Sequence, residues 1–160
     1  MYKLVVYMLV LAVFTLVFAL QAEQEMAMQA LFRAKRAVNY AAHAGAQQVD
    51  AAKLSAGIVA LDPAAAETAA LTYLRANLQL DESNAPLPGS FLRTRVDVLA
   101  FDVVNDTTTF PYTYSNGAYG FTAQLRQPGV ALVARVEYPR LFSLLPPIVW
   151  NVKGAAELVR

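Results

Sequence analysis

The sequence predicts an α+β fold in which one long N-terminal helix, apolar in its first half, carries a small C-terminal head. Two observations indicate this class. Residues 4–20 carry no charge, and residues 1–44 contain neither proline nor glycine, so a helix can run through them without interruption. From residue 91 onward apolar residues alternate with polar ones, which is the period of a β-strand. We expect the head to hold one helix and an antiparallel sheet of three to five strands.

The composition excludes several functional classes. The 160-residue chain has 13 basic and 12 acidic residues, and this balance argues against a nucleic-acid-binding protein. It has one histidine and no cysteine, so disulfides, cysteine-zinc sites and thiol catalysis are excluded. Charged residues make up 16% of the chain. Because about a quarter is usual, we expect much of the surface to face something other than water.

Residues 1–20 are compatible with a membrane. As a helix they reach roughly 30 Å, which is the thickness of the hydrocarbon core of a bilayer. A cleaved signal peptide is the alternative, with Lys3 as its basic start. The junction Leu20-Gln21-Ala22 is a poor cleavage site, however, so we expect the segment to remain on the mature chain.

Residues 21–54 are rich in alanine and predict a continuation of the same helix. Alanine recurs at spacings of three and four, which gives a heptad pattern filled with small residues. Small residues let helix backbones approach closely, as in small-xxx-small pairs. We therefore expect this seam to pack against other subunits, with residues 1–54 as the long helix and residues 55–160 as the head. The alanine seam consists of Ala27, Ala30, Ala34, Ala37, Ala41 and Ala44, with Gly45 beside it.

Charged residues are sparse on the alanine-rich region. They are Glu23, Glu25, Arg33, Lys35 and Arg36. We expect them to be solvated or to form ion pairs between subunits. His43 has no second imidazole in the chain, so we expect no metal site there.

The head begins with a helix that has clear start and stop signals. Asp62 is the predicted N-cap, and Pro63 occupies the first helical position. The helix should end near Leu78, because residues 81–89 contain two prolines and a glycine and form a loop.

Alternating residues predict the strands of the head. The first strand includes residues 96–100, and further strands cover residues 120–124, 130–138 and 148–159. Asn116-Gly117 is a tight-turn signal. It predicts a hairpin in which Tyr112 to Tyr114 face Tyr119 to Phe121.

The sequence offers little catalytic chemistry, so we expect no enzymatic activity, no catalytic residues and no cofactor. Asp97 and Asp102 lie on one predicted strand region, but nothing indicates that they converge. The triplet Asn105-Asp106-Thr107 matches an N-glycosylation acceptor. Asn105, Thr107, Thr108 and Thr109 are therefore candidate glycosylation residues, and the alternative is a hydrated turn on an exposed loop.

The layout and several segments resemble a known family. A long helix with an apolar start and a small α+β head is the layout of type IV pilin-like proteins. The run LVARVEY at 132–138, PRLF at 139–142 and IVWNVKGAA at 148–156 resemble the closing hairpin of TadE/TadG-like pseudopilins of tight-adherence pili. RAKRAV at 33–38 and VALDP at 59–63 are also similar. The resemblance implies export, residence in the membrane before assembly, and incorporation into a pilus-like filament or its assembly apparatus.

We therefore consider two functional hypotheses. The first is a structural subunit of an extracellular pilus-like filament. Its partners would be copies of itself, the inner (cytoplasmic) membrane before assembly and the pilus assembly machinery. The alternative is a bitopic membrane protein with an extracytoplasmic binding head, or a component of a pilus or secretion apparatus. The alanine seam favours the first hypothesis, because a solitary anchor has no use for a close-packing stripe.

Overall fold

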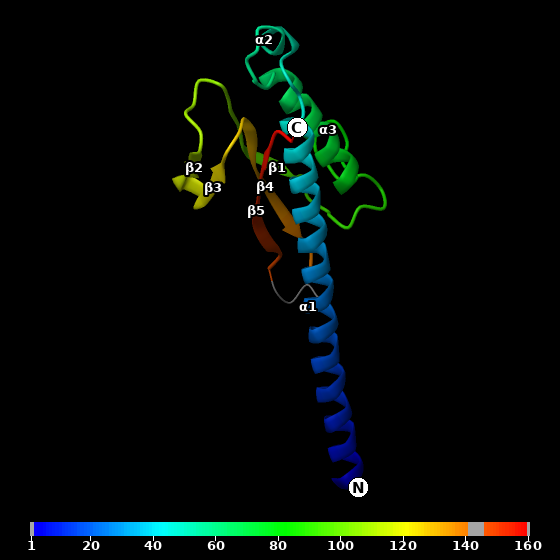
Figure 1. The fold of residues 1–160 in the computed structure, drawn as a ribbon. Coiled ribbons are helices and arrows are strands. Elements are labelled where there is room, and N and C mark those ends of the chain that lie inside the picture. Colours follow the sequence, from blue (N-terminus) through cyan, green and yellow to red (C-terminus); the bar gives the residue numbers. More distant parts are fainter. Residues whose placement is uncertain (1, 141–145, 160) are drawn as a thin grey trace.

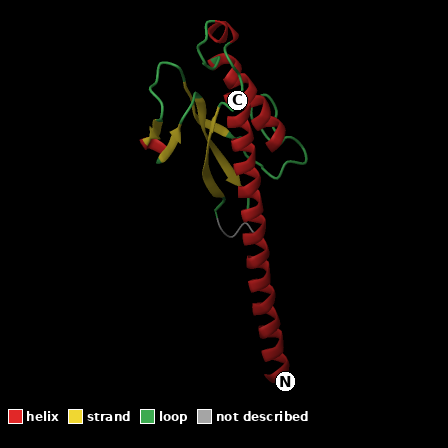
Figure 2. Ribbon diagram, in the orientation of Figure 1, coloured by secondary structure: helices red, strands yellow, loops and turns green. Residues whose placement is uncertain are grey.

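The computed structural model describes residues 2–140 and 146–159, and it confirms the α+β class. One long helix, α1, runs from its N-terminal end into a head built of helices and strands (Figures 1 and 2). The described residues form three α-helices and five strands, and the strands make two antiparallel sheets, of three and two strands.

Helix α1 (Tyr2–Ala46) is continuous, which confirms the prediction of no break between the apolar and alanine-rich regions. Its 45 residues give a length of about 68 Å. The helix ends at Ala46 and not at the expected residue 54. A short helix, α2 (Ala51–Ser55), follows it, because the Asp50 side chain accepts hydrogen bonds from the N–H groups of Ala52 and Lys53 and starts a new helix.

Helix α3 (Pro63–Leu78) follows the sequence prediction at both ends. Asp62 caps it by accepting hydrogen bonds from the N–H groups of Ala64 and Ala65, at 3.0 and 3.1 Å. The helix ends where Gln79 adopts a left-handed backbone conformation with φ of 55°.

The larger sheet contains β1 (Asp97–Val104), β4 (Gly129–Tyr138) and β5 (Ile148–Glu157) in the order β1-β4-β5. Strand β4 is central and pairs antiparallel with both neighbours. Alternate residues of β4 face opposite sides of the sheet. Leu132 and Val136 belong to the core that includes α1, whereas Ala131 packs with the separate hairpin on the other side.

That hairpin consists of β2 (Tyr112–Asn116) and β3 (Phe121–Leu125). The sequence correctly predicted a hairpin, but its predicted register was wrong. Tyr112 is opposite Leu125 and Tyr114 is opposite Ala123. A short 3₁₀ turn, η1 (Gly117–Tyr119), forms the connection, so Tyr119 lies in the turn and not across from the first tyrosines. Gly120, with φ of 55°, permits this longer turn.

The core of the head lies between the sheet and the two long helices. The C-terminal part of α1 contacts α3, β4 and β5. Gly154 on β5 shows how closely α1 approaches the sheet, because a Cβ atom there would lie 3.0 Å from Val38 Cγ1 and 2.9 Å from Asn39 Oδ1. The alanine-rich part of α1 is therefore a structural part of the head.

Candidate functional site

The first part of α1, residues 2–20, is an apolar segment without any packing partner in the chain. Its side chains are exposed around the whole circumference of the helix, with Ala19 half-buried. The helix is long and apolar enough to cross a membrane, and the 18-residue window with this property is not buried. Its length of about 29 Å approximates the hydrocarbon thickness of about 30 Å. We call residues 2–20 the apolar segment.

The threonine of the apolar segment makes its hydrogen bond inside the helix. The Thr15 hydroxyl donates a hydrogen bond to the Leu11 carbonyl at 2.8 Å. Lys3 lies near the helix start, where a long side chain can reach a polar boundary. A helix of this kind leaves few unpaired polar groups when it is surrounded by hydrocarbon or by other apolar helices.

The alanine seam lies inside the head. Ala34 and Ala41 are fully buried, Ala37 is 1% exposed, and Ala27 and Ala30 are nearly buried. The expected role of this seam as a subunit contact is therefore wrong for these residues, since no surface remains for a neighbouring chain. The physical reason is that α3 and the sheet of the same chain cover the seam.

Gly45 and Ala44 sit at the end of the same seam. Gly45 is buried, and a Cβ atom there would lie 3.0 Å from the Ala66 carbonyl oxygen and 3.4 Å from Ala70 Cβ. The small-xxx-small pair formed with Ala41 thus brings α1 close to α3 within one chain. Ala44 is half-buried, beside a groove with the exposed His43.

A buried acidic residue lies where the head adjoins the apolar segment, a region that we call the base of the head. The sequence did not predict its burial. Glu23, expected to be solvated or paired between subunits, is 3% exposed, and its Oε2 lies 4.0 Å from Arg140 Nη1. Its Oε1 has no hydrogen-bond partner among the described residues. The sequence signal was weak: Glu23 is the first charge after the apolar segment, but nothing in the pattern linked it to Arg140.

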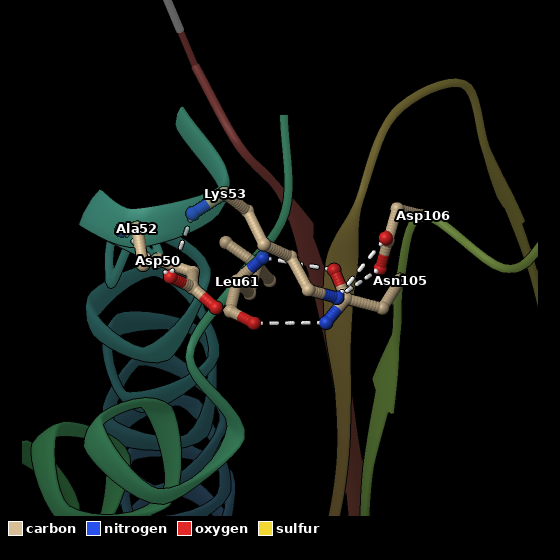
Figure 3. Close-up of polar contacts among 6 residues, drawn as sticks. All are labelled: Asp50, Ala52, Lys53, Leu61, Asn105 and Asp106. Carbon is tan, nitrogen blue, oxygen red and sulfur yellow. Dashed lines mark hydrogen bonds and ion pairs between the residues drawn. The ribbon is translucent and has the colours of Figure 1, made fainter. Parts of the chain in front are cut away.

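The Asn105 side chain joins two distant segments of the head (Figure 3). Its Oδ1 accepts a hydrogen bond from the Leu61 N–H, and its Nδ2 donates to the Leu61 carbonyl, both at 2.8 Å. Beside it, Lys53 Nζ forms an ion pair with Asp106 at 2.9 Å. The candidate glycosylation amide is thus engaged with the backbone of its own chain.

The threonine run lies on a loop between β1 and β2, as predicted. Thr107 and Thr109 are exposed and Thr108 is half-buried. At least two of the three threonines are therefore accessible from solvent.

Two titratable side chains of the head, Asp102 and Tyr114, contact each other. Asp102 accepts a hydrogen bond from the Tyr114 hydroxyl. Burial raises the pKa of Tyr114, and the hydrogen bond to Asp102 raises this pKa further. Within residues 2–140 and 146–159, no group of three or more histidine or acidic side chains is arranged to hold a metal ion.

Comparison with known proteins gives no relative. No protein-family model matches the chain, and no similar curated protein or solved structure was found. The family resemblance described above therefore remains a prediction from the quoted segments.

Proposed function

We propose that this chain is a structural subunit of an extracellular pilus-like filament, and that the apolar segment of α1 holds it in the inner membrane before assembly. One observation carries the proposal. The apolar segment is exposed on all sides and continues without a break into the core of the head. A solvent-exposed helix of a globular protein has one apolar face and one polar face, whereas this segment has no polar face.

The apolar segment is more stable when other apolar groups shield it from water. Each large apolar side chain that leaves water gains about 1.5–3 kcal/mol. Leu4, Leu9, Phe14 and Phe18 are all more than 60% exposed, and they are four of many such residues. Lipid hydrocarbon covers them before assembly, and the same segments of neighbouring subunits cover them in the filament.

The rigid connection between the apolar segment and the head supports a repeating assembly. Helix α1 has no proline, and its only glycine is near its C-terminal end. The head is packed directly on the second half of the same helix. Every subunit therefore presents its head in the same orientation to its apolar segment, which a helical filament with identical contacts requires.

A second candidate function has support from a specific observation. A bitopic membrane protein with an extracytoplasmic binding head, or a component of the assembly apparatus, would use the same anchor. The buried alanine seam favours this alternative, because the seam no longer supplies a stripe for neighbouring subunits. For either role we propose a non-enzymatic protein, and for the filament role its partners include the pilus assembly machinery.

The distinguishing experiment examines material sheared from the cell surface. An antibody against the head should label filaments in negative-stain images, and the chain should be present in both the sheared and the membrane fractions. A chain confined to the membrane fraction, with unlabelled filaments, would contradict the filament role and favour the anchored alternative.

A further inference from the structure

We propose that the base of the head binds the phosphate group of an anionic phospholipid. This inference rests on one part of the proposed function, namely that the apolar segment of α1 lies in a membrane. The site is a pocket of about 410 Å³ beside α1. Its lining includes three arginines from different parts of the chain and three apolar or aromatic side chains: Arg33, Arg93, Arg140, Met26, Phe91 and Tyr138.

The part of the pocket nearest the apolar segment lies at the depth of the lipid headgroups. A hydrocarbon core of about 30 Å covers roughly 20 helical residues, and the headgroup layer on each side adds about 5–7 Å, or about three to five residues. Counted from Tyr2, the hydrocarbon ends near residue 21 and the headgroup layer extends to about Met26. Met26 lines the pocket, and Arg140 lies 4.0 Å from Glu23 in the same layer. Arg33 is higher on α1, but side chains of a helix lean toward its N-terminus, here toward the membrane.

Each arginine is held in place and keeps free donors. The Arg33 guanidinium carbon lies 6.0 Å from the centre of the Phe91 ring. Arg93 donates to the Ser90 carbonyl at 3.2 Å, and Arg140 Nε donates to the Pro146 carbonyl at 2.9 Å. A guanidinium has five N–H donors, so each arginine retains several that can bind phosphate oxygens in its preferred forked geometry.

The charges favour an anionic over a zwitterionic lipid. No acidic residue lines the pocket. The nearby carboxylates are Glu23, which is close to Arg140, and Glu25, which accepts a hydrogen bond from Gln29 at 3.1 Å. A phosphatidylglycerol headgroup brings one negative charge to the three arginines, whereas the choline group of phosphatidylcholine adds a positive charge that they repel.

Native mass spectrometry of the detergent-solubilised full chain tests the proposal, with phosphatidylglycerol or phosphatidylcholine added separately. We expect about tenfold greater retention of phosphatidylglycerol. The double variant Arg33→Gln with Arg93→Gln should lose this preference and still fold, because both side chains are exposed. The matched control, Arg126→Gln with Arg135→Gln, removes the same charge from two other exposed positions and should keep the preference.

Three results would overturn the proposal. They are equal retention of the two lipids, a preference that survives in the Arg33/Arg93 double variant, and displacement of phosphatidylglycerol by an equal concentration of inorganic phosphate. The last result would identify a site for free anions. Because the measurement uses single subunits in detergent, it does not depend on filament formation, and a failure of either experiment leaves the other interpretable.

Discussion

At the end of the head opposite the apolar segment, individual side chains stabilise the fold through contacts of unequal strength. Leu61 is fully buried, and both of its backbone polar groups are satisfied by the Asn105 side chain. The adjacent ion pair between Lys53 and Asp106 is partly exposed to solvent, which weakens it. The Asn105 contacts should therefore contribute more to stability than the ion pair.

Replacing Asn105 by alanine tests this ranking. Asn105→Ala leaves the N–H and carbonyl of Leu61 buried and unpaired, so we expect the free energy of unfolding to fall by about 1–3 kcal/mol. Asp106→Ala should lower it by less than about 1 kcal/mol. Denaturant unfolding of the detergent-solubilised chain provides both values.

Thr107→Ala is the matched control for Asn105→Ala. It also destroys the Asn105-Asp106-Thr107 glycosylation pattern, but it keeps both hydrogen bonds to Leu61, so we expect a change within about 0.5 kcal/mol. If both variants lost the same stability, and each chain also lost more mass than the substitution removes, an attached sugar would instead stabilise the loop.

Tyr114 predicts a pH dependence of stability. Its pKa is raised in the folded chain, so the neutral hydroxyl stabilises the fold below the ordinary tyrosine pKa of about 10, and this contribution is lost as the pH rises through the folded-state pKa. We expect Tyr114→Phe to lower the free energy of unfolding at pH 7 by about 1–2 kcal/mol. The difference between wild type and variant should narrow above pH 10. A constant difference from pH 7 to pH 11 would contradict the raised pKa.

At the scale of elements, helix α1 has two halves with different environments. The apolar segment has no partner in the chain, and the alanine-rich half is the central helix of the head. The packing therefore divides the chain within α1 near Glu23, and not at residue 54. Substitutions in the alanine-rich half should therefore destabilise the head, whereas substitutions in the apolar segment should leave the head folded.

Ala37→Glu and Ala41→Glu test the assignment of the alanine seam. Each variant would place a carboxylate in the core of the head without a partner, which costs several kcal/mol. We expect both variants to give an unfolded or degraded head, measured by circular dichroism and protease resistance. Gln47→Glu, at an exposed position just after α1, should fold normally. A folded head combined with lost filaments in the alanine variants would restore the seam as a subunit contact.

The sequence predicted the elements better than their partners. The lack of proline and glycine was sufficient to predict a continuous α1, and Asp62-Pro63 predicted the start of α3. Alanine at spacings of three and four predicted a close-packing face, but the same pattern suits contact within a chain and between chains. The hairpin register depended on the 3₁₀ turn at Gly117–Tyr119, which a two-residue turn signal does not reveal. The pocket at the base of the head combines arginines distant in sequence, so no local pattern could identify it.

In the whole molecule, different parts of the chain determine stability and assembly. The head completes its own core with half of α1, and the apolar segment remains available for lipid or for other subunits. We propose that this segment exchanges lipid for copies of itself when the filament forms. Mutations in the core should then reduce the amount of subunit, whereas contacts of the apolar segment should change with the assembly state.

Photo-crosslinking from Phe14 measures this exchange most directly. Phe14 is 68% exposed, and replacing it with the photoreactive residue p-benzoylphenylalanine keeps an apolar aromatic side chain at the centre of the apolar segment. The same replacement of Tyr73, which is exposed on α3, is the control. We expect Phe14 to give a ladder of linked subunits in the sheared filament fraction and lipid adducts in the membrane fraction, whereas Tyr73 should give no ladder. Lipid adducts alone from Phe14, in every fraction, would contradict the exchange of lipid for neighbouring subunits and identify a solitary membrane anchor.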